Sequence, residues 1–385
     1  MQLQNTDNKI LGRWSELNGE LEIKDLKKGM DFRLPKYRRE VFLRFYEFHL
    51  KHRAHPGAVY FAMPWLAKHF DMDQEQKLWI AFINGCSQNI VTTYKIFQQF
   101  PTLKNLDIEK LDSWWNESHQ KFKVGSGWDT DRKYFKLGKT GFPACVKSYK
   151  DHIDKYGSQV EFFNHIQYNN DKFKNFEKAW DFFRNNVLSF GRLSTFSYLE
   201  YLRIQGLNID CNNLFLEDIS GSRSHRNGLC KVLGRDDLDW WKEKIKYDKK
   251  TIDWLIEESN LLFEEAKARI DHHDVSLFTF ESTLCCYKSW HRPNRRYPNV
   301  YIDMFHDRIK YAELVHQEKL DIFWQMRKEC LPEYLRLEDN PNDPGLSKEK
   351  QNHYLDTGQV IMMEKEWDCF ENNFNKFNNV LFFSE

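Results

Sequence analysis

The chain has 385 residues, of which 41% are hydrophobic and 16% aromatic, and its net charge is zero. A chain of this length can hold two or three domains, or one unit with two lobes. A net charge of zero excludes a protein whose whole surface is basic and attracts polyanions. The 8 cysteines form no Cys-x-x-Cys pair, which argues against a structural zinc site. No apolar run reaches the ~18 residues of a membrane span, so we expect a soluble protein of a reducing cytoplasm.

Charge is distributed unevenly along the chain. Residues 333–385 contain 11 acidic and 5 basic residues, so the first 332 residues carry a net charge of +6. Within them, residues 33–53 hold 7 Lys and Arg against 2 acids, and residues 288–310 hold 6 against 2. Local basic clusters on a neutral chain favour a focused nucleic-acid groove over a generally adhesive surface.

Apolar residues recur at helical spacing through most of the chain, and strand signals are few. The pattern predicts helices over residues 37–51, 74–84, 90–100, 162–187 and 242–270. We therefore predict a mainly α-helical protein.

The chain divides by composition into three parts. Residues 1–30 form a polar N-terminal extension, and residues 31–332 form a helical catalytic unit. That unit has two lobes, near 31–187 and 188–332. Residues 333–385 form an acidic C-terminal segment in which we find no chemistry.

A polar break, NGCSQN at residues 84–89, separates two of the predicted helices. Buried amides need hydrogen-bond partners. The break is therefore either a turn that faces a ligand or a capped helix junction, and the sequence leaves both open.

Residues 138–140, Gly-Lys-Thr, resemble the end of a phosphate-binding P-loop. The full motif needs a glycine at position 133, where the chain has Lys133. The motif is therefore absent, and we do not predict a kinase.

A glycine and a hydroxyl cluster open the next predicted helix, which begins after Gly191. Glu200 follows Phe196 by four residues and shares its face. Glu200 is either a solvated helix acid or a buried base, and both interpretations stay open.

The richest stretch is GSRSHRNGLCKVLGRDD, residues 221–237, with three glycines, four Lys or Arg and one His. Backbone N–H groups, hydroxyls and guanidinium groups presented together bind anions. We predict an anion-binding loop, for phosphate, at this place. The alternative is a solvated polar turn followed by an ordinary helix start.

The sequence Asp271-His272-His273-Asp274 has the residue types of a metal site. Neighbouring residues on a helix do not face one point, and no second pair lies at a matching distance. We expect neither a metal nor a cofactor in this protein.

Residues 278–290 form the second dense patch. If they are helical, Glu281 and Lys288 share a face with Leu284 and Cys285. The acid and the amine are either a routine salt bridge or a base and a phosphate clamp. A basic loop closed by prolines follows at residues 291–298.

Five spaced motifs together resemble the bacteriophage amino acid:DNA transferases, also called alpha-glutamyl/putrescinyl thymine pyrophosphorylases. The similarity spans about residues 33–310 of the chain. The motifs are RFYEF at 44–48 with HPG at 55–57 and YF at 60–61; FING at 82–85 with QN at 88–89; residues 191–200; SHRNG at 224–228 with GRDD at 234–237; and residues 280–288 with RYP at 296–298.

The resemblance implies a reaction on double-stranded phage DNA in the cytoplasm of an infected bacterium. A 5-hydroxymethyluracil base, activated as a phosphate or pyrophosphate ester, loses that group to an amine from an amino acid or a polyamine. The resemblance also implies a helical fold related to base-excision DNA glycosylases, with helix-hairpin-helix architecture.

The implied chemistry assigns roles to the residues already described. The polyanionic leaving group needs cationic and hydroxyl donors, for which we name Ser222, Arg223, Arg226, Lys231 and Lys288. The nucleophile needs a proton acceptor, for which the candidates are Glu281, Glu200 and His225. A flipped base needs a pocket, formed by Tyr60, Phe61, Asn84, Gln88 and Asn89, with Trp65 as a further stacking residue. The DNA strand needs phosphate contacts, assigned to Arg38, Arg39, Arg292, Arg295 and Arg296.

This interpretation requires residues 222–226 to lie beside a candidate carboxylate. Two other functions remain as alternatives. One is a DNA glycosylase or modified-base-binding protein of similar shape, and the other is an enzyme acting on free 5-substituted deoxyuridine nucleotides.

Overall fold

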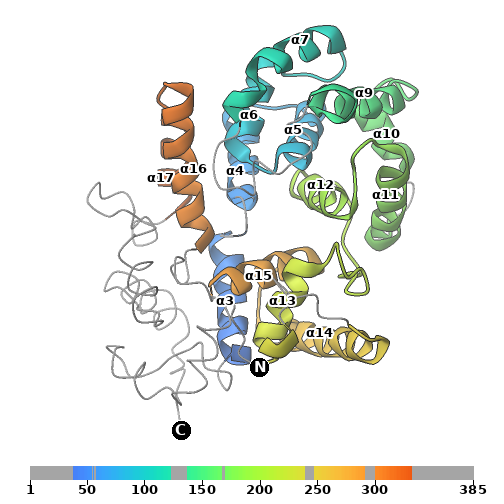
Figure 1. Ribbon diagram of the computed structural model, residues 1–385, viewed down its shortest axis with the longest axis vertical. Helices are drawn as coiled ribbons and strands as arrows, with labels where there is room; N and C mark the ends of the chain where they lie inside the picture. The colour runs from blue at the N-terminus through green and yellow to red at the C-terminus, as the bar shows by residue number, and fades with distance from the viewer. Residues whose placement is uncertain are drawn as a thin grey trace. The chain divides into compact units, whose positions relative to one another are not determined.

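A computed structural model describes residues 38–53, 55, 58–122, 137–166, 170–238, 247–290 and 300–331 (Figure 1). These residues form fourteen α-helices and three short 3₁₀ helices, and no strand occurs among them. The prediction of a mainly α protein is confirmed. None of the helices described has the length and apolar composition needed to cross a bilayer. The predicted N-terminal extension and acidic C-terminal segment lie outside the described residues, as does the basic loop at 291–298.

The chain divides into two compact units, each built from separate stretches of sequence. The described part of unit 1 comprises residues 38–55, 214–304 and 331, with the gaps given above. The described part of unit 2 comprises residues 58–213 and 305–330. The division therefore differs from the single boundary near residue 187 that composition suggested.

Unit 2 carries most of the helices. They are α4 (Val59–His69), α5 (Gln74–Ser87), α6 (Ile90–Gln99), α7 (Ile108–Ser118), η3 (His119–Phe122), η5 (Gly138–Thr140), α9 (Phe142–Ile153), α10 (Gln159–Ile166), α11 (Lys172–Asn186), α12 (Arg192–Ile204) and α17 (Asp321–Cys330). Helix α16 (Val300–His316) begins in unit 1 and continues in unit 2 from residue 305.

Helices α5 and α12 form the centre of unit 2. Asp73 starts α5 with a capping box, since its carboxylate accepts from the Gln76 N–H at 2.8 Å and the Gln76 side chain accepts from the Asp73 N–H. Phe82 on α5 stacks on Tyr149 of α9 with ring centroids 3.9 Å apart, and Tyr198 of α12 meets Phe82 edge-on. These three aromatic side chains pack the centre of unit 2.

Unit 1 is built from α3 (Arg38–His52), α13 (Arg223–Val232), η6 (Asp236–Leu238), α14 (Lys249–Arg269) and α15 (Leu277–Trp290) (Figure 1). Phe42 of α3 packs edge-on against Phe280 and Tyr287 of α15, and both ring pairs have centroids 5.5 Å apart. The Tyr46 hydroxyl joins the same two helices through Thr279 Oγ1, 2.7 Å away.

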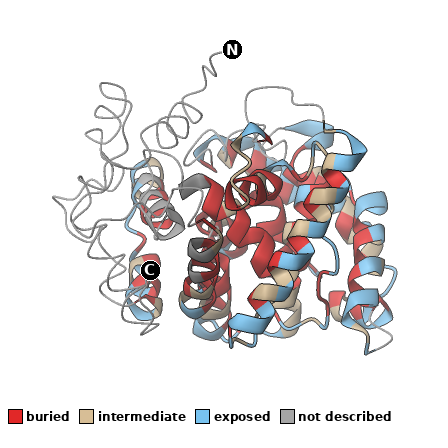
Figure 2. Ribbon diagram, turned by 90° about the horizontal axis from the view of Figure 1, so that it is seen from below, coloured by how far each residue is buried: buried red, intermediate tan, exposed pale blue. Residues whose placement is uncertain are grey.

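Helix α13 is largely buried within unit 1. All residues from His225 to Val232 are buried, although the segment contains an arginine, a lysine, an asparagine and a histidine. Figure 2 colours the described helices by burial, with buried residues in red and exposed residues in pale blue. The prediction of an anion-binding loop over residues 221–237 was therefore wrong about its conformation. Residues 223–232 form a helix whose polar side chains from His225 onward face protein atoms, because α15 and α14 pack against it.

Candidate functional site

Helices α13 and α15 cross in close contact and bring their polar side chains together. Gly228 makes the approach feasible, since the Leu284 backbone occupies the space that a side chain would need. The residues on either side of this contact are the polar ones of both dense sequence patches. The geometry of the site follows from this crossing.

His225 and Glu281 are the central pair. The Nδ1 atom of His225 lies 2.8 Å from Glu281 Oε1, and both side chains are buried. The Nε2 atom of His225 lies 2.9 Å from the carbonyl oxygen of Leu214. A carbonyl only accepts, so Nε2 carries a proton and donates it, which orients the ring and turns Nδ1 toward the carboxylate.

Cys285 completes a cluster of three with that pair. One ligand-type atom each of His225, Glu281 and Cys285 lies within 4.8 Å of the other two. Glu281 and Cys285 are four residues apart on α15, so they share one face of the helix. Cys285 is half-buried, which gives this cluster access to solvent.

Lys288 extends the cluster by one helical turn. Its ammonium donates a hydrogen bond to Ser224 Oγ at 2.7 Å, and the lysine is 8% exposed. Ser224 lies next to His225 in the first turn of α13. A buried cation, a hydroxyl, an imidazole and a carboxylate therefore lie along one crossing of two helices, as the sequence-based interpretation requires of residues 222–226 and Glu281.

Arg226 and Ser222, which were predicted to bind phosphate, bind backbone carbonyls of the protein. The Arg226 guanidinium is fully buried, donates to the carbonyls of Leu216, Asp218 and Ile219, and lies over the Tyr247 ring. The Ser222 hydroxyl donates to the Phe215 carbonyl at 2.5 Å. Both side chains hold residues 214–219 against α13, and we assign them that role. Arg223, by contrast, is exposed in the first turn of α13.

Arg38 and Lys231 meet at Asp236. Arg38 donates two hydrogen bonds to the Asp236 carboxylate, at 2.9 and 3.1 Å, and Lys231 Nζ lies 3.3 Å from it. Burial raises the pKa of Asp236, but the charges of Lys231 and Arg38 outweigh burial and hold that pKa below its ordinary value. Arg38 is 0% exposed, so we remove it from the residues proposed to contact DNA.

Of the other predicted DNA contacts, Arg39 lies within the described residues. Its side chain is 41% exposed and pairs with Glu265 at 2.7 Å. Arg292, Arg295 and Arg296 lie in a segment outside the described residues.

The third candidate base lies in unit 2. The Tyr60 hydroxyl of α4 donates to Glu200 Oε1 of α12 at 2.8 Å, and both residues are buried. Glu200 is thus a buried carboxylate and not a solvated helix acid. Phe61 and Trp65 lie on the same helix as Tyr60, with Phe61 packed edge-on against Phe305.

The polar break at residues 84–89 is a capped helix junction. The Asn89 side chain accepts from the Val91 and Thr92 N–H groups at the start of α6, and Asn84 Oδ1 accepts from Thr93 Oγ1. Gln88 ends α5 in a left-handed conformation with φ 49°. Asn89 therefore has a structural role that the sequence left as one of two alternatives.

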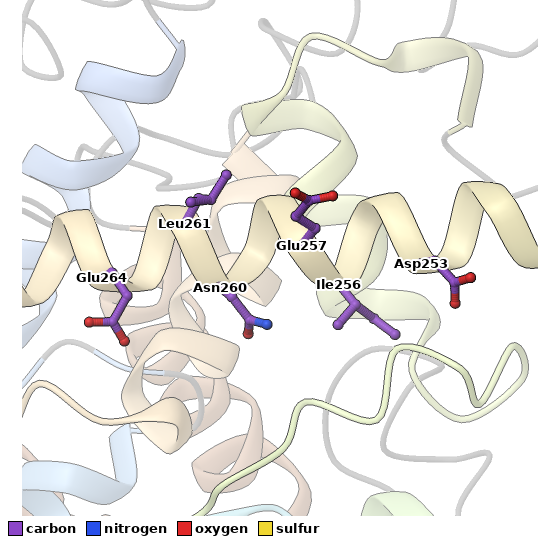
Figure 3. A pocket seen from close by; sticks show the side chains of 6 residues that line it. All are labelled: Asp253, Ile256, Glu257, Asn260, Leu261 and Glu264. Carbon is purple, nitrogen blue, oxygen red and sulfur yellow. The ribbon is translucent and has the colours of Figure 1, made fainter.

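A shallow hollow of about 400 Å³ lies along the outer face of α14, away from the α13–α15 crossing (Figure 3). Its lining comes from Asp253, Ile256, Glu257, Asn260, Leu261 and Glu264. Three carboxylates repel phosphate, so this hollow does not suit an anionic substrate.

Comparison with known proteins decides the family. The family model for amino acid:DNA transferases matches residues 59–296, more than half of the chain. The chain belongs to the amino acid:DNA transferase family. The transferase is 28% identical over 305 residues to a protein named serinyltransferase from Salmonella phage ViI, and the match covers 74% of this chain and 71% of that protein.

The matched range includes α13, α15 and the complete set of Ser224, His225, Glu281, Cys285 and Lys288. Family membership makes the protein a transferase that modifies DNA, with DNA and an amino acid as its partners. No solved structure matches the chain, so the expected relation to DNA glycosylases stays a prediction.

Sequence reasoning did not assign roles to Cys285 and Asn227. Cys285 follows Glu281 by one helical turn, and this spacing predicts that they share a face of the helix. It does not predict that Cys285 lies near His225, which is distant in sequence. Asn227 is fully buried, and neither its amide oxygen nor its amide nitrogen has a hydrogen-bond partner among the described residues. Such an unpaired amide calls for an explanation, because burial without partners costs about 1–3 kcal/mol per group.

Proposed function

We propose that the transferase replaces the phosphate or pyrophosphate of an activated 5-hydroxymethyluracil in phage DNA with an amino acid or polyamine, joined through its amine. The observation that carries this proposal is the contact of His225 with Glu281 beside the Lys288–Ser224 pair, within the range matched by the family. The relative named serinyltransferase supports an amino acid as the donor.

The reaction divides into two tasks, each with its own residues. The nucleophile's nitrogen attacks the exocyclic methylene carbon, the carbon–oxygen bond breaks, and the leaving group departs with the electron pair. Lys288 and Arg223, with the Ser224 hydroxyl, neutralise the charge that develops on the leaving oxygen. The proton of the amine passes to the Glu281–His225 pair, where the Leu214 carbonyl stabilises the ring from its other side.

Unit 2 contains the other candidate carboxylate and a set of aromatic residues. Glu200 is held by Tyr60, so its carboxylate is oriented and largely shielded from water. We propose that Tyr60, Phe61 and Trp65 stack on a base extruded from the duplex, and that Gln88 and Asn84 provide its polar contacts.

Contacts with the DNA strand complete the proposal. Arg39, Arg292, Arg295 and Arg296 belong to the two basic stretches of the sequence and are proposed to bind backbone phosphates. The enzyme would act in the cytoplasm of the infected bacterium, where the phage DNA is modified. From the sequence, neither a metal nor a cofactor was expected.

The test uses a duplex oligonucleotide with one 5-(pyrophosphoryloxymethyl)uracil and, as control, the same duplex with unactivated 5-hydroxymethyluracil. With labelled serine or putrescine, we expect release of pyrophosphate and a product nucleoside that is heavier than the 5-hydroxymethyluracil nucleoside of the control by the mass of the donor minus water, with the glycosidic bond intact. Fragmentation of the serine product distinguishes attachment through nitrogen from attachment through oxygen. Release of a free base would identify a glycosylase, and unchanged DNA with all donors would refute the proposal.

A further inference from the structure

Three atoms with lone pairs converge where α13 crosses α15. They belong to His225, Glu281 and Cys285, whose nearest ligand-type atoms all lie within 4.8 Å of one another. We propose that these three side chains bind a divalent metal ion of the zinc type. Metal binding can be measured without the transfer reaction, and only the purpose assigned to the ion rests on the proposed function.

The ligand types and their spacing suit zinc. Zinc takes imidazole nitrogen, carboxylate oxygen and thiolate sulfur at bond lengths of about 2.0–2.3 Å, so ligand atoms of a tetrahedral site lie about 3.3–3.6 Å apart. The observed cluster is within rotamer adjustment of that geometry. Two ligands one helical turn apart and a third from a facing helix are an arrangement in which the backbone fixes all three.

The hydrogen bond on the far side of the imidazole gives an independent argument. Nε2 of His225 donates to the Leu214 carbonyl, so the lone pair of a neutral ring lies on Nδ1. That lone pair faces a carboxylate oxygen 2.8 Å away, and two lone pairs at this distance repel unless a proton or a cation lies between them. Histidines that bind metals characteristically donate their other ring N–H to a backbone carbonyl or carboxylate.

Burial distinguishes the kind of metal site. His225 and Glu281 are buried, whereas Cys285 is half-buried and gives the cluster its access to solvent. Three protein ligands with an accessible fourth position are typical of catalytic zinc, whereas structural zinc has four protein ligands. The fourth position would take an oxygen of the leaving group, next to Lys288, and the ion would act there as a Lewis acid.

This assignment changes the roles of two residues in the proposed function. Glu281 and His225 become ligands, so neither accepts the proton of the nucleophile. The pair of His272 and His273 stays outside the site, because the Asp274 N–H donates to His272 Nδ1 and His273 is exposed.

The test measures metal content in the full-length protein, purified without a histidine tag. After dialysis against chelator and reloading with zinc or cobalt(II), we expect about one equivalent of metal per chain. The cobalt form should show the intense near-ultraviolet band of a thiolate–cobalt bond and visible bands of a four-coordinate ion. Glu281→Gln and Cys285→Ser should each lower the bound metal at least tenfold, and Cys285→Ser should abolish the thiolate band.

Two matched controls separate this site from casual binding. His273→Asn removes an exposed histidine of the same unit, and Cys330→Ser removes another half-buried cysteine. Both should keep one equivalent of metal and the thiolate band. Because loss of metal could follow from misfolding, each variant is first compared with the wild type by circular dichroism and thermal melting.

Each outcome decides the proposal. Less than a tenth of an equivalent in the wild type, or equal binding in wild type and Cys285→Ser, means an adventitious ion only and overturns it. Metal binding that depends on Glu281 and Cys285 establishes the site even if no transfer is detected, in which case the proposed function fails alone. If the enzyme binds no metal and the metal-depleted form still transfers the donor, the proposed function is supported and the proposed metal site is refuted.

Discussion

Gly228 lies so close to Leu284 that a Cβ atom added at residue 228 would be 2.1 Å from the Leu284 carbonyl oxygen. The neighbour is backbone, which cannot rotate away as a side chain can. This contact sets the distance between α13 and α15, and therefore the separation of His225 from Glu281 and of Ser224 from Lys288. The site depends on a residue with no side chain.

Gly228→Ala should therefore destabilise the protein although alanine favours helices. At an exposed helix position the change would add about 1 kcal/mol of stability. Here the overlap must push the two helices apart, and overpacking of this kind costs about 1–3 kcal/mol or more. We expect a lower free energy of unfolding in denaturant titration and loss of transfer activity. Gly191→Ala is the control, because no atom lies within 4 Å of a Cβ there and the expected change is under about 1 kcal/mol. Equal stability of both variants would contradict the close crossing.

Arg226→Ala should mainly reduce stability. The Arg226 guanidinium supplies three carbonyl groups of residues 214–219 with hydrogen bonds, and charged donors of this kind contribute about 1.5–3 kcal/mol each. Loss of the guanidinium should lower the melting temperature by several degrees. The rate of transfer should fall with it.

Arg223→Ala is the matched comparison for Arg226. Arg223 lies three residues earlier, in the first turn of α13, and is exposed. Its removal should leave the melting temperature unchanged and slow release of the leaving group about tenfold or more. If Arg226→Ala instead melts like the wild type but does not turn over, Arg226 binds substrate and the assignment to residues 214–219 is wrong.

Much of the fold was predictable because helix periodicity is a local signal. The segments predicted at 37–51, 74–84 and 90–100 correspond to α3, α5 and α6 within a few residues. The candidate base Glu281 and the clamp Lys288 were identified by their shared helix face, which also depends on nearby residues alone.

The conformation of residues 221–237 was not predictable in the same way. Its glycines and cations are typical of a loop, but Gly228 serves to admit the backbone of Leu284, which is distant in sequence. Burial of Arg226 and Arg38 depends likewise on carbonyls and a carboxylate brought up by other segments. Cationic residues were interpreted as ligands for a substrate because their protein partners could not be seen from the sequence.

Stability should fall in mildly acidic solution because of His49. The side chain is fully buried on α3, and neither ring nitrogen has a hydrogen-bond partner among the described residues. Burial, followed by the charges of His55 and His52, lowers the pKa of His49 well below 6.5. As pH falls below about 6.5, His49 therefore binds a proton in the unfolded chain but not in the folded chain.

The sign follows from that difference in proton binding. The stabilisation is fully present above about pH 6.5 and is lost as pH falls, by up to about 1.4 kcal/mol per pH unit for this residue. His49→Phe keeps a ring in place and should flatten the decline between pH 6.5 and 5.5 in denaturant titrations. The control His165→Asn replaces an exposed histidine and retains His49. Its free energy of unfolding should decline with falling pH as that of the wild type does. An unchanged slope in His49→Phe would contradict the burial of a neutral imidazole.

Glu281→Gln and Glu200→Gln distinguish the two candidate bases. Each glutamine keeps the shape of its glutamate, and at residue 200 its amide oxygen still accepts the Tyr60 hydroxyl. Removal of a general base should lower the single-turnover rate about 10²–10⁴-fold with DNA affinity unchanged. If Glu281 binds a metal, its variant loses metal and rate together, whereas Glu200→Gln loses rate and the ascending limb of the pH profile but keeps the metal. Glu257→Gln, on the outer face of α14, should behave as the wild type in each assay. Wild-type rates in both test variants would show that neither carboxylate accepts the proton.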